Sequence, residues 1–250
     1  MSTFLSVNLN KVALVRNTRH LGIPAVTFAA AVCLDAGAHG ITVHPRADQR
    51  HITPDDVRDI ARRLKPLRPG VEFNIEGDPR PDLIDLVHEV RPEQCTIVPV
   101  APGEVTSQAG WTRGPQTEGL AEVIAAMKAA GIRVSLFVDP NIEAIALARE
   151  LGADRVELYT EPFARAFEYG KAEGARSFAV YADAARAAHA AGMGINAGHD
   201  LDLDNLVLFR DLPHLEEVSI GHAIMSRALY VGLERVVREY LDILAPASAG

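Results

Sequence analysis

Two histidines and two arginines fall within eight residues at the end of a short apolar run, Gly40-Ile-Thr-Val-His44-Pro-Arg46-Ala-Asp-Gln-Arg50-His51. Histidine can accept and donate a proton near neutral pH. Arginine stays charged and presents a planar fork of donors that suits phosphate or carboxylate. The pattern indicates a buried strand whose carboxyl end delivers proton-transfer and anion-binding groups into one loop. A solvated turn with scattered charges is the alternative.

Further polar residues follow the other apolar runs of the chain. If the runs are parallel strands of a barrel, their carboxyl ends meet at one mouth. The titratable residues His44, Glu76 and His199 would then converge there, where burial can tune their pKa values. Single members also have structural explanations, such as Glu157 pairing with an arginine. The strand-end residues are Asn8, Asn10, Lys11, His44, Arg46, Glu76, Pro99, Asp139, Glu157, Thr160, His199, Gly221 and His222.

Strand-like and helix-like patterns alternate from end to end. Eight strand–helix units, spaced by roughly 25–35 residues, favour a (β/α)8 TIM barrel, an α/β fold with one domain over residues 1–250. A doubly wound open sheet is the competitor. It is disfavoured because no glycine-rich dinucleotide turn follows the first run, and because every strand end carries polar groups. The expected strands are residues 4–9, 40–44, 71–75, 94–100, 132–138, 155–159, 194–197 and 217–220.

Between these strands, apolar spacing predicts the helices and one long loop. Residues 101–117 are rich in Gly, Pro, Ser and Thr, and this length suggests an active-site lid. Glycines at 170 and 174 weaken the pattern of residues 163–191, and the last helix is expected to be continuous. The expected helices are residues 25–36, 53–64, 81–90, 118–130, 142–151, 163–191, 203–210 and 223–244.

Composition restricts the partners and the compartment. The chain has 250 residues, 48% of them hydrophobic, and a net charge of -8, which argues against nucleic acid held by bulk charge. Its two cysteines show no disulfide or metal spacing, so a cytoplasmic location is expected. No signal peptide is evident, and no apolar run reaches the about 18 residues that a membrane span needs.

Two glycine-containing turns, Gly198-His199 and Gly221-His222, lie at the last two strand ends, where barrels commonly bind phosphate. Glycine lets backbone amides approach an anion, and the amino terminus of the following helix favours negative charge. We interpret Ser219-Ile-Gly-His222-Ala-Ile-Met as a phosphate cradle; a plain strand–helix turn is the alternative. A second anion site is expected near the first two strands, from Arg16, Arg19, Arg46 and Arg50.

No metal is expected. The paired histidines typical of metal-dependent barrel hydrolases would lie on the first strand, where Asn8 and Asn10 stand instead. Three of the chain's histidines could still bind a metal together with a carboxylate, but close-spaced ligand pairs are missing. Those residues are His44, His199 and His222, with Glu76 or Asp139.

Taken in chain order, these motifs resemble the pyridoxine 5′-phosphate synthase family, barrel enzymes that close the vitamin B6 ring. The resemblance implies a cofactor-free condensation of 3-amino-2-oxopropyl phosphate with 1-deoxy-D-xylulose 5-phosphate. The products would be pyridoxine 5′-phosphate, inorganic phosphate and water. The matching stretches are Val7-Asn8-Leu9, Arg16-Asn17 with Arg19, residues 37–46, Arg50-His51-Ile-Thr, Phe73-Asn74-Ile75-Glu76, Val98-Pro99, Glu104-Val-Thr106-Ser, residues 134–139, Asn196-Ala-Gly-His199 and Ile220-Gly221-His222-Ala-Ile.

The resemblance also assigns roles to residues of this chain. It implies that His44 and Glu76 accept protons, that His199 donates one, and that the chain forms an octamer built from dimers. Many family members have Asp-His where this chain has Asn10-Lys11, and a glycine where it has Asp200. All three residues are nevertheless expected to contact substrate. The full set of expected substrate-binding residues is Asn8, Asn10, Lys11, Arg19, Arg46, His51, Thr106, Asp200, Gly221 and His222.

Two other function classes are open to this sequence. Another phosphosugar barrel, such as an isomerase or aldolase, is the enzymatic alternative. An aldolase usually needs a metal or a buried lysine on a strand, and of the four lysines only Lys11 is placed near the mouth. A phosphate-ligand sensor without catalysis is the non-enzymatic alternative, and the presence of His44, Glu76 and His199 together argues against it.

Overall fold

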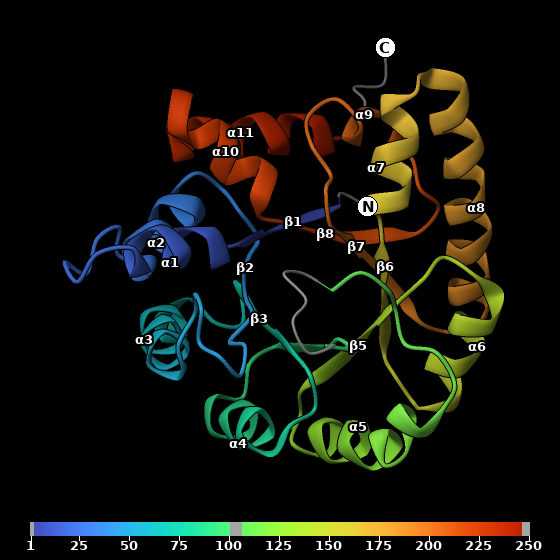
Figure 1. The fold of residues 1–250 in the computed structure, drawn as a ribbon, viewed down its shortest axis with the longest axis horizontal. Coiled ribbons are helices and arrows are strands. Elements are labelled where there is room, and N and C mark those ends of the chain that lie inside the picture. The colour runs from blue at the N-terminus through green and yellow to red at the C-terminus, as the bar shows by residue number, and fades with distance from the viewer. Residues whose placement is uncertain (1–2, 101–106, 247–250) are drawn as a thin grey trace.

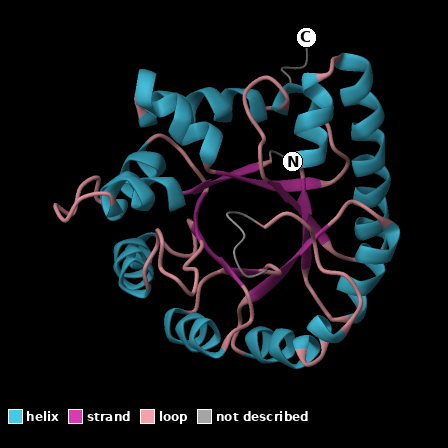
Figure 2. Ribbon diagram, in the orientation of Figure 1, coloured by secondary structure: helices cyan, strands magenta, loops and turns pink. Residues whose placement is uncertain are grey.

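The computed structural model describes residues 3–100 and 107–246. Eight parallel strands form a closed barrel in sequence order, and the last strand pairs with the first (Figure 1). Helices surround this barrel as an outer ring (Figure 2). The architecture confirms the predicted (β/α)8 barrel and excludes the open sheet. The strands are β1 (Phe4–Asn8), β2 (Gly40–Val43), β3 (Glu72–Gly77), β4 (Gln94–Ile97), β5 (Arg133–Val138), β6 (Arg155–Tyr159), β7 (Gly194–Gly198) and β8 (Leu215–Ile220).

Two predicted helical regions are each divided at a glycine. Gly170 separates the region 163–191 into two helices, as its pattern allowed, but the last helix was wrongly expected to be continuous. It breaks at Gly232, whose φ of +89° is a left-handed conformation that glycine adopts without strain. The helices are α1 (Asn10–Asn17), α2 (Val26–Asp35), α3 (Pro54–Leu64), α4 (Pro81–Val90), α5 (Leu120–Ala129), α6 (Ile142–Glu150), α7 (Glu161–Glu168), α8 (Lys171–Ala190), α9 (Leu206–Phe209), α10 (His222–Val231) and α11 (Leu233–Leu244), with short 3-10 turns at Lys65–Leu67 and Pro115–Thr117.

Helix α1 was not predicted. It has eight residues, no acidic residue in its first turn and no side-chain cap, so local signals for it are weak. Burial of Val12 and Ala13 against the core holds it in place. Because α1 begins at Asn10, Lys11 lies in the first turn of a helix and not in a loop.

Polar side chains fill the inside of the barrel, while apolar side chains on the other strand face pack beneath the helices. Side chains of a barrel strand alternate between these two directions. On the inside, the hydroxyls of Ser6 and Thr42 are 2.7 Å apart, and Thr96 donates to Asn74 Oδ1 at 3.1 Å. Val7 and Ile41, on the other face, are fully buried in the hydrophobic core. The alternation therefore carries polar groups up to the mouth of the barrel.

None of the helices in the described ranges is long and apolar enough to cross a membrane. Helix α3, for example, buries one face, on which Val57, Ile60 and Leu64 are fully buried.

Candidate active site

A cavity of about 450 Å³ opens at the carboxyl ends of the strands. It brings together residues that are distant in the sequence but were predicted to share a site. Arg19 is exposed beyond the end of α1 and does not line the cavity, and Thr106 lies outside the described residues, so their roles stay predictions. The predicted residues that line the cavity are Asn8, Asn10, Lys11, His44, Arg46, His51, Glu76, His199, Asp200, Gly221 and His222.

Glu76 and His44 form the buried centre of this cavity. Glu76 Oε2 lies 3.8 Å from His44 Nδ1 and accepts a hydrogen bond from Asn8 Nδ2 at 3.3 Å. Burial raises the pKa of Glu76 to about 7, against the opposing effects of Arg46 and Asn8. Glu76 can therefore both accept and release a proton near neutral pH.

His44 is held as a neutral base. Burial lowers the pKa of His44 well below its usual value, and the positive charge of Arg46 adds to this effect. Its contact with Glu76 is therefore not an ion pair at neutral pH, despite the short separation. Asn10 Oδ1 accepts from the His44 backbone N–H at 2.8 Å, which fixes the start of the loop. His44 lines the cavity, and its Nε2 is buried without a hydrogen-bond partner among the described residues.

His199 is held in a strained turn directly after β7. Its φ of +86° and that of Asp200, +56°, are left-handed values that residues other than glycine rarely adopt. The Thr160 hydroxyl lies against the carbonyl oxygens of Gly198, at 2.6 Å, and of His199, and can donate to either. Burial lowers the pKa of His199, while the Asp200 carboxylate opposes that shift. The surrounding structure thus maintains an unfavourable backbone to present this ring.

Glu157 is a further cavity residue, which the sequence left open as one half of an arginine pair. Burial raises its pKa well above the usual value, and the negative charge of Glu76 adds to the shift. Its neighbour Arg155 instead bonds Glu216 and Asn196, each at 2.7 Å. Burial thus favours the protonated form of Glu157, whose Oε2 has no partner among the described residues. The sequence signal for Glu157 as a cavity residue was a glutamate at an inward-facing strand position.

Cationic and donor groups gather on the β2 side of the cavity. Arg46 is buried beside Glu76 and His44, and Lys11 is half-buried at the rim. His51 Nδ1 accepts the backbone N–H of Ile52 at 2.9 Å, so its proton resides on Nε2. Burial and the charge of Arg46 lower the pKa of His51 to about 4, which makes it a neutral donor. This wall can receive an anion.

The Gly221 turn provides the opposite wall. Helix α10 begins directly after it, so the positive end of the helix dipole lies at the cavity. A Cβ atom on Gly221 would lie 3.0 Å from the Cβ of Asn8, tighter than side chains normally pack, so glycine allows the turn to approach β1. Ser219 Oγ also lines the cavity and has no partner among the described residues. This wall suits a second anion.

The loop after β4 is anchored where the structure describes it. Trp111 is buried, and its Nε1 donates to Ile97 O at 3.0 Å. Gly110 lies so close to Val138 and Asp139 that a Cβ atom would be 2.3–2.5 Å from their backbone. The expected lid at 101–117 is thus fixed at Gly110 and Trp111, and residues 101–106 lie outside the described part.

Metal ligands do not cluster in the described ranges: no group of three or more His, Cys, Asp or Glu side chains there could hold an ion. The polar groups of the cavity suit proton transfer and the donation of hydrogen bonds to anions.

Comparisons with known proteins agree on a family. The family model described as pyridoxal phosphate biosynthesis protein PdxJ matches residues 5–246. A protein of Albidiferax ferrireducens named pyridoxine 5′-phosphate synthase is 52% identical over 251 residues, covering 98% of both chains. One of the same name from Xanthomonas campestris pv. campestris is 52% identical over 253 residues, covering 98% of this chain and 97% of the relative.

Solved structures with low sequence identity show the likeness of the fold alone. Phosphoribosyl anthranilate isomerase from Thermotoga maritima has a TM-score of 0.57 at 13% identity, over 97% of this chain and 98% of that one. A 4-hydroxy-2-oxoglutarate aldolase has a TM-score of 0.60 at 17% identity, over 96% and 94%. Both likenesses extend over almost the whole barrel.

Proposed function

The chain belongs to the family of pyridoxal phosphate biosynthesis protein PdxJ, and we propose from this that it is a pyridoxine 5′-phosphate synthase. The reaction condenses 3-amino-2-oxopropyl phosphate with 1-deoxy-D-xylulose 5-phosphate and yields pyridoxine 5′-phosphate, inorganic phosphate and water. The observation that carries the proposal is one cavity in which His44, Glu76 and His199 lie between two anion-binding walls.

The chemistry requires proton transfer in both directions. An amine adds to a ketone and water leaves, a ring closes, and a phosphate is expelled, so groups on the substrates must lose and gain protons in turn. Glu76, with a pKa of about 7, can do both. Neutral His44 can accept a proton. The family resemblance assigns to His199 the donation of a proton to a leaving oxygen. Glu157, whose protonated form burial favours, can hydrogen-bond a developing oxyanion.

The two proposed anion-binding walls account for two phosphorylated substrates. One phosphate would lie near Arg46 and His51, and the other at the Gly221 turn and the start of α10. Asn8, Asn10 and Asp200 also line the cavity, where they would orient the reacting carbonyl and amine by hydrogen bonds. Holding both substrates in one geometry removes much of the entropic barrier to condensation.

Direct assay tests the proposal. Purified protein incubated with both substrates should produce pyridoxine 5′-phosphate and release inorganic phosphate in step with it, without an added cofactor or metal. Product formation would be followed by liquid chromatography with mass spectrometry. Absence of product from protein that binds both substrates would contradict the proposed function.

Lys11 is expected to bind a substrate electrostatically, without a covalent intermediate. It lies half-buried in the first turn of α1 at the rim, not on a barrel strand where a Schiff-base lysine would be buried. Lys11→Met should therefore mainly raise KM, by a penalty on the order of 1–3 kcal/mol for a lost charged hydrogen bond, with kcat little changed. Steady-state kinetics measures this.

The aldolase alternative provides the contrary outcome for Lys11. Borohydride treatment in the presence of either substrate would trap a Schiff base as a stable adduct, which peptide mass spectrometry would locate. An adduct on Lys11, lost in Lys11→Met but retained in Lys128→Met on the outer surface, would overturn the electrostatic role.

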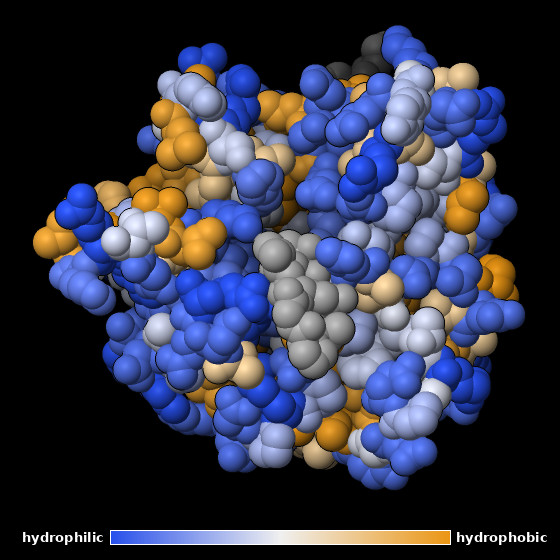
Figure 3. Space-filling view, viewed as in Figure 1, coloured by the Kyte–Doolittle hydropathy of each residue, from blue (hydrophilic) through white to orange (hydrophobic). Residues whose placement is uncertain are grey.

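We also propose that the chain assembles as an oligomer, an octamer by the family resemblance. The sequence of the last helical region, residues 223–244, has apolar residues at helical spacing, but those on α11 belong mostly to the core, since Val236, Val237 and Tyr240 are buried. Exposed apolar residues gather instead on α10, α1 and α2, where Figure 3 shows hydrophobic colour along one side of the molecule. They are Leu14, Val15, Phe28, Leu229 and Tyr230.

Charge on this apolar side should weaken the assembly. Leu229 and Tyr230 are 80% and 87% exposed, so Leu229→Glu with Tyr230→Glu should lower the mass in light scattering without unfolding the chain. Tyr169→Glu, at an equally exposed tyrosine that follows α7, is the matched control and should keep the native mass. A monomeric native protein at micromolar concentration would refute the oligomer.

The cytoplasmic location stays a proposal that rests on the two cysteines. Cys33 and Cys95 are both free and buried, which suits a reducing compartment.

A further inference from the structure

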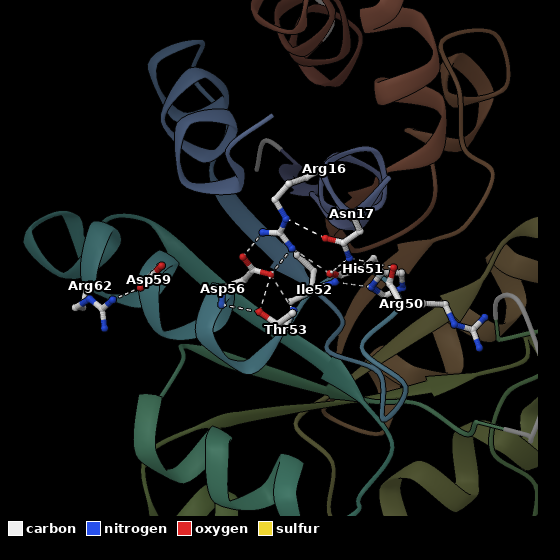
Figure 4. A network of polar contacts seen from close by, with 9 residues as sticks. All are labelled: Arg16, Asn17, Arg50, His51, Ile52, Thr53, Asp56, Asp59 and Arg62. Carbon is white, nitrogen blue, oxygen red and sulfur yellow. Dashed lines mark hydrogen bonds and ion pairs between the residues drawn. The ribbon is translucent and has the colours of Figure 1, made fainter. Parts of the chain in front are cut away.

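We propose that Arg16 and Asn17, in the last turn of α1, are positioning residues that hold His51 in the anion-binding wall of the cavity. Neither side chain lines the cavity. Arg16 was expected to bind an anion itself, but the structure directs it to the back of the loop that carries His51 (Figure 4). The inference deepens the proposed function, on which it rests for the identity of the anion as a substrate phosphate.

Three hydrogen bonds from two side chains of α1 converge on the backbone of this loop. Asn17 Nδ2 donates to the carbonyl oxygens of His51, at 2.8 Å, and of Arg50, at 3.2 Å. Arg16 Nη2 donates to the same His51 oxygen at 3.2 Å. Arg16 Nε also donates to Asn17 Oδ1 at 3.0 Å, which fixes which end of the amide faces the loop. The His51 carbonyl is thus held from two side chains at once.

Asp56 anchors this arrangement to α3. Both oxygens of Asp56 accept from the Arg16 guanidinium, and Nη2 to Oδ2 is 2.8 Å. Asp56 Oδ2 also accepts the Thr53 backbone N–H at 2.8 Å, and the Thr53 hydroxyl caps the helix through the Asp56 N–H. Burial acts to raise the pKa of Asp56, but hydrogen bonds from Arg16 and Thr53 outweigh it and leave that pKa below its usual value. The carboxylate therefore stays charged beside Arg16.

The backbone position of His51 determines where its donor points. The N–H of Ile52 occupies His51 Nδ1, so Nε2–H is the atom left for a ligand. His51 is 7% exposed and lines the cavity with Arg46, Arg50 and Lys11. Burial, together with the charges of these three residues, lowers its pKa and keeps the ring neutral. Because the Ile52 N–H fixes the His51 ring relative to the loop backbone, a shift of the His51 carbonyl moves Nε2 as well. Arg16 and Asn17 prevent that shift.

The proton-transfer groups are held by other contacts. Asn8 and Asn10 fix Glu76 and His44, and Thr160 fixes the turn of His199. Loss of the α1 contacts should therefore weaken anion binding more than it slows the chemical steps. Loss of a residue with a purely structural role would not weaken anion binding while leaving the chemical steps almost unchanged.

Asn17→Leu keeps the approximate size of the side chain and removes both donors, and Arg16→Lys keeps the charge but loses the fork. Each should weaken the binding of inorganic phosphate, measured by calorimetry, and raise KM for one phosphorylated substrate, both by about tenfold, with kcat within about threefold of the native value. Arg62→Lys is the matched control, since Arg62 pairs with Asp59 on the exposed face of α3 and should change neither quantity (Figure 4).

A double-mutant cycle tests whether the effect passes through His51. In a His51→Ala background, Asn17→Leu should cause no further loss of phosphate affinity. Additive losses would overturn the proposal, as would a fall in kcat with unchanged phosphate affinity and KM. If Asn17→Leu does not fold, the same cycle with Arg16→Lys in its place decides whether the effect passes through His51. Phosphate calorimetry needs no turnover, so native protein that binds phosphate but makes no product would reject the synthase activity and leave the positioning role to be judged by the cycle.

Discussion

Replacing His199 by alanine should reduce the rate of pyridoxine 5′-phosphate formation by about 10²- to 10⁴-fold in kcat, the usual contribution of a general acid. The imidazole lies in the cavity beside Glu157 and the Gly221 turn, and its strained turn is maintained by Thr160. Alanine removes the proposed proton donor and leaves the proposed phosphate-binding walls in place. KM should therefore change far less than kcat.

His214→Ala is the matched control, because His214 also has a positive φ of 60° but stacks on His189 away from the cavity. It should retain the native rate. Circular dichroism and thermal unfolding would show whether the His199 variant keeps its fold, since the ring also packs against Phe137 at 4.9 Å between centroids. A folded variant with near-native turnover would remove His199 from the proton-donor role.

The barrel could be predicted because its signals are local. Each strand is a short apolar run that ends in a polar group, and each is followed by a helical pattern, so order along the chain determines order around the barrel. Helix α1 could not be predicted, since its eight residues lack a cap and are stabilised by tertiary packing. The continuous last helix was an error because spacing alone does not reveal that Gly232 takes a left-handed turn.

The residues that form the site could be predicted from the sequence, but their protonation states could not. Strand-end position was enough to bring His44, Glu76 and His199 to one cavity. Their proton affinities depend on neighbours from other strands, such as Arg46 beside Glu76, and no local pattern contains that information. Arg16 illustrates the same limit: its residue type suits an anion, but its partner Asp56 lies forty residues away.

Glu76→Gln should be as damaging as the loss of His199, with a fall in kcat of about 10²- to 10⁴-fold. Glutamine keeps the shape of the side chain and can still contact Asn8, but its amide cannot accept a proton. Activity of the native protein should fall as the pH drops below the Glu76 pKa of about 7, because the protonated carboxyl is no longer a base. The residual activity of the variant should lack this limb of the pH profile.

Stability should change in the opposite sense to activity. Because the pKa of Glu76 is raised in the folded state, the folded protein binds more protons than the unfolded chain between the usual value and about 7. Its stability therefore falls as the pH rises through that window, and the penalty is complete above it. Glutamine never ionises, so the melting temperature of Glu76→Gln relative to the native protein should rise from about pH 5 to about pH 8.

Glu157→Gln distinguishes the contribution of Glu76 to the pH profile from that of its buried neighbour Glu157. Burial favours the protonated form of Glu157, and glutamine also presents a donor, so this variant should keep the pH limb near 7 even if its rate falls. Rates measured across the pH range, with melting curves in the same buffers, would test both variants. A native rate and an unchanged pH profile in Glu76→Gln would show that the base lies elsewhere. His44, whose Nε2 has no hydrogen-bond partner in residues 3–100 and 107–246, would then be the remaining acceptor among the predicted catalytic residues.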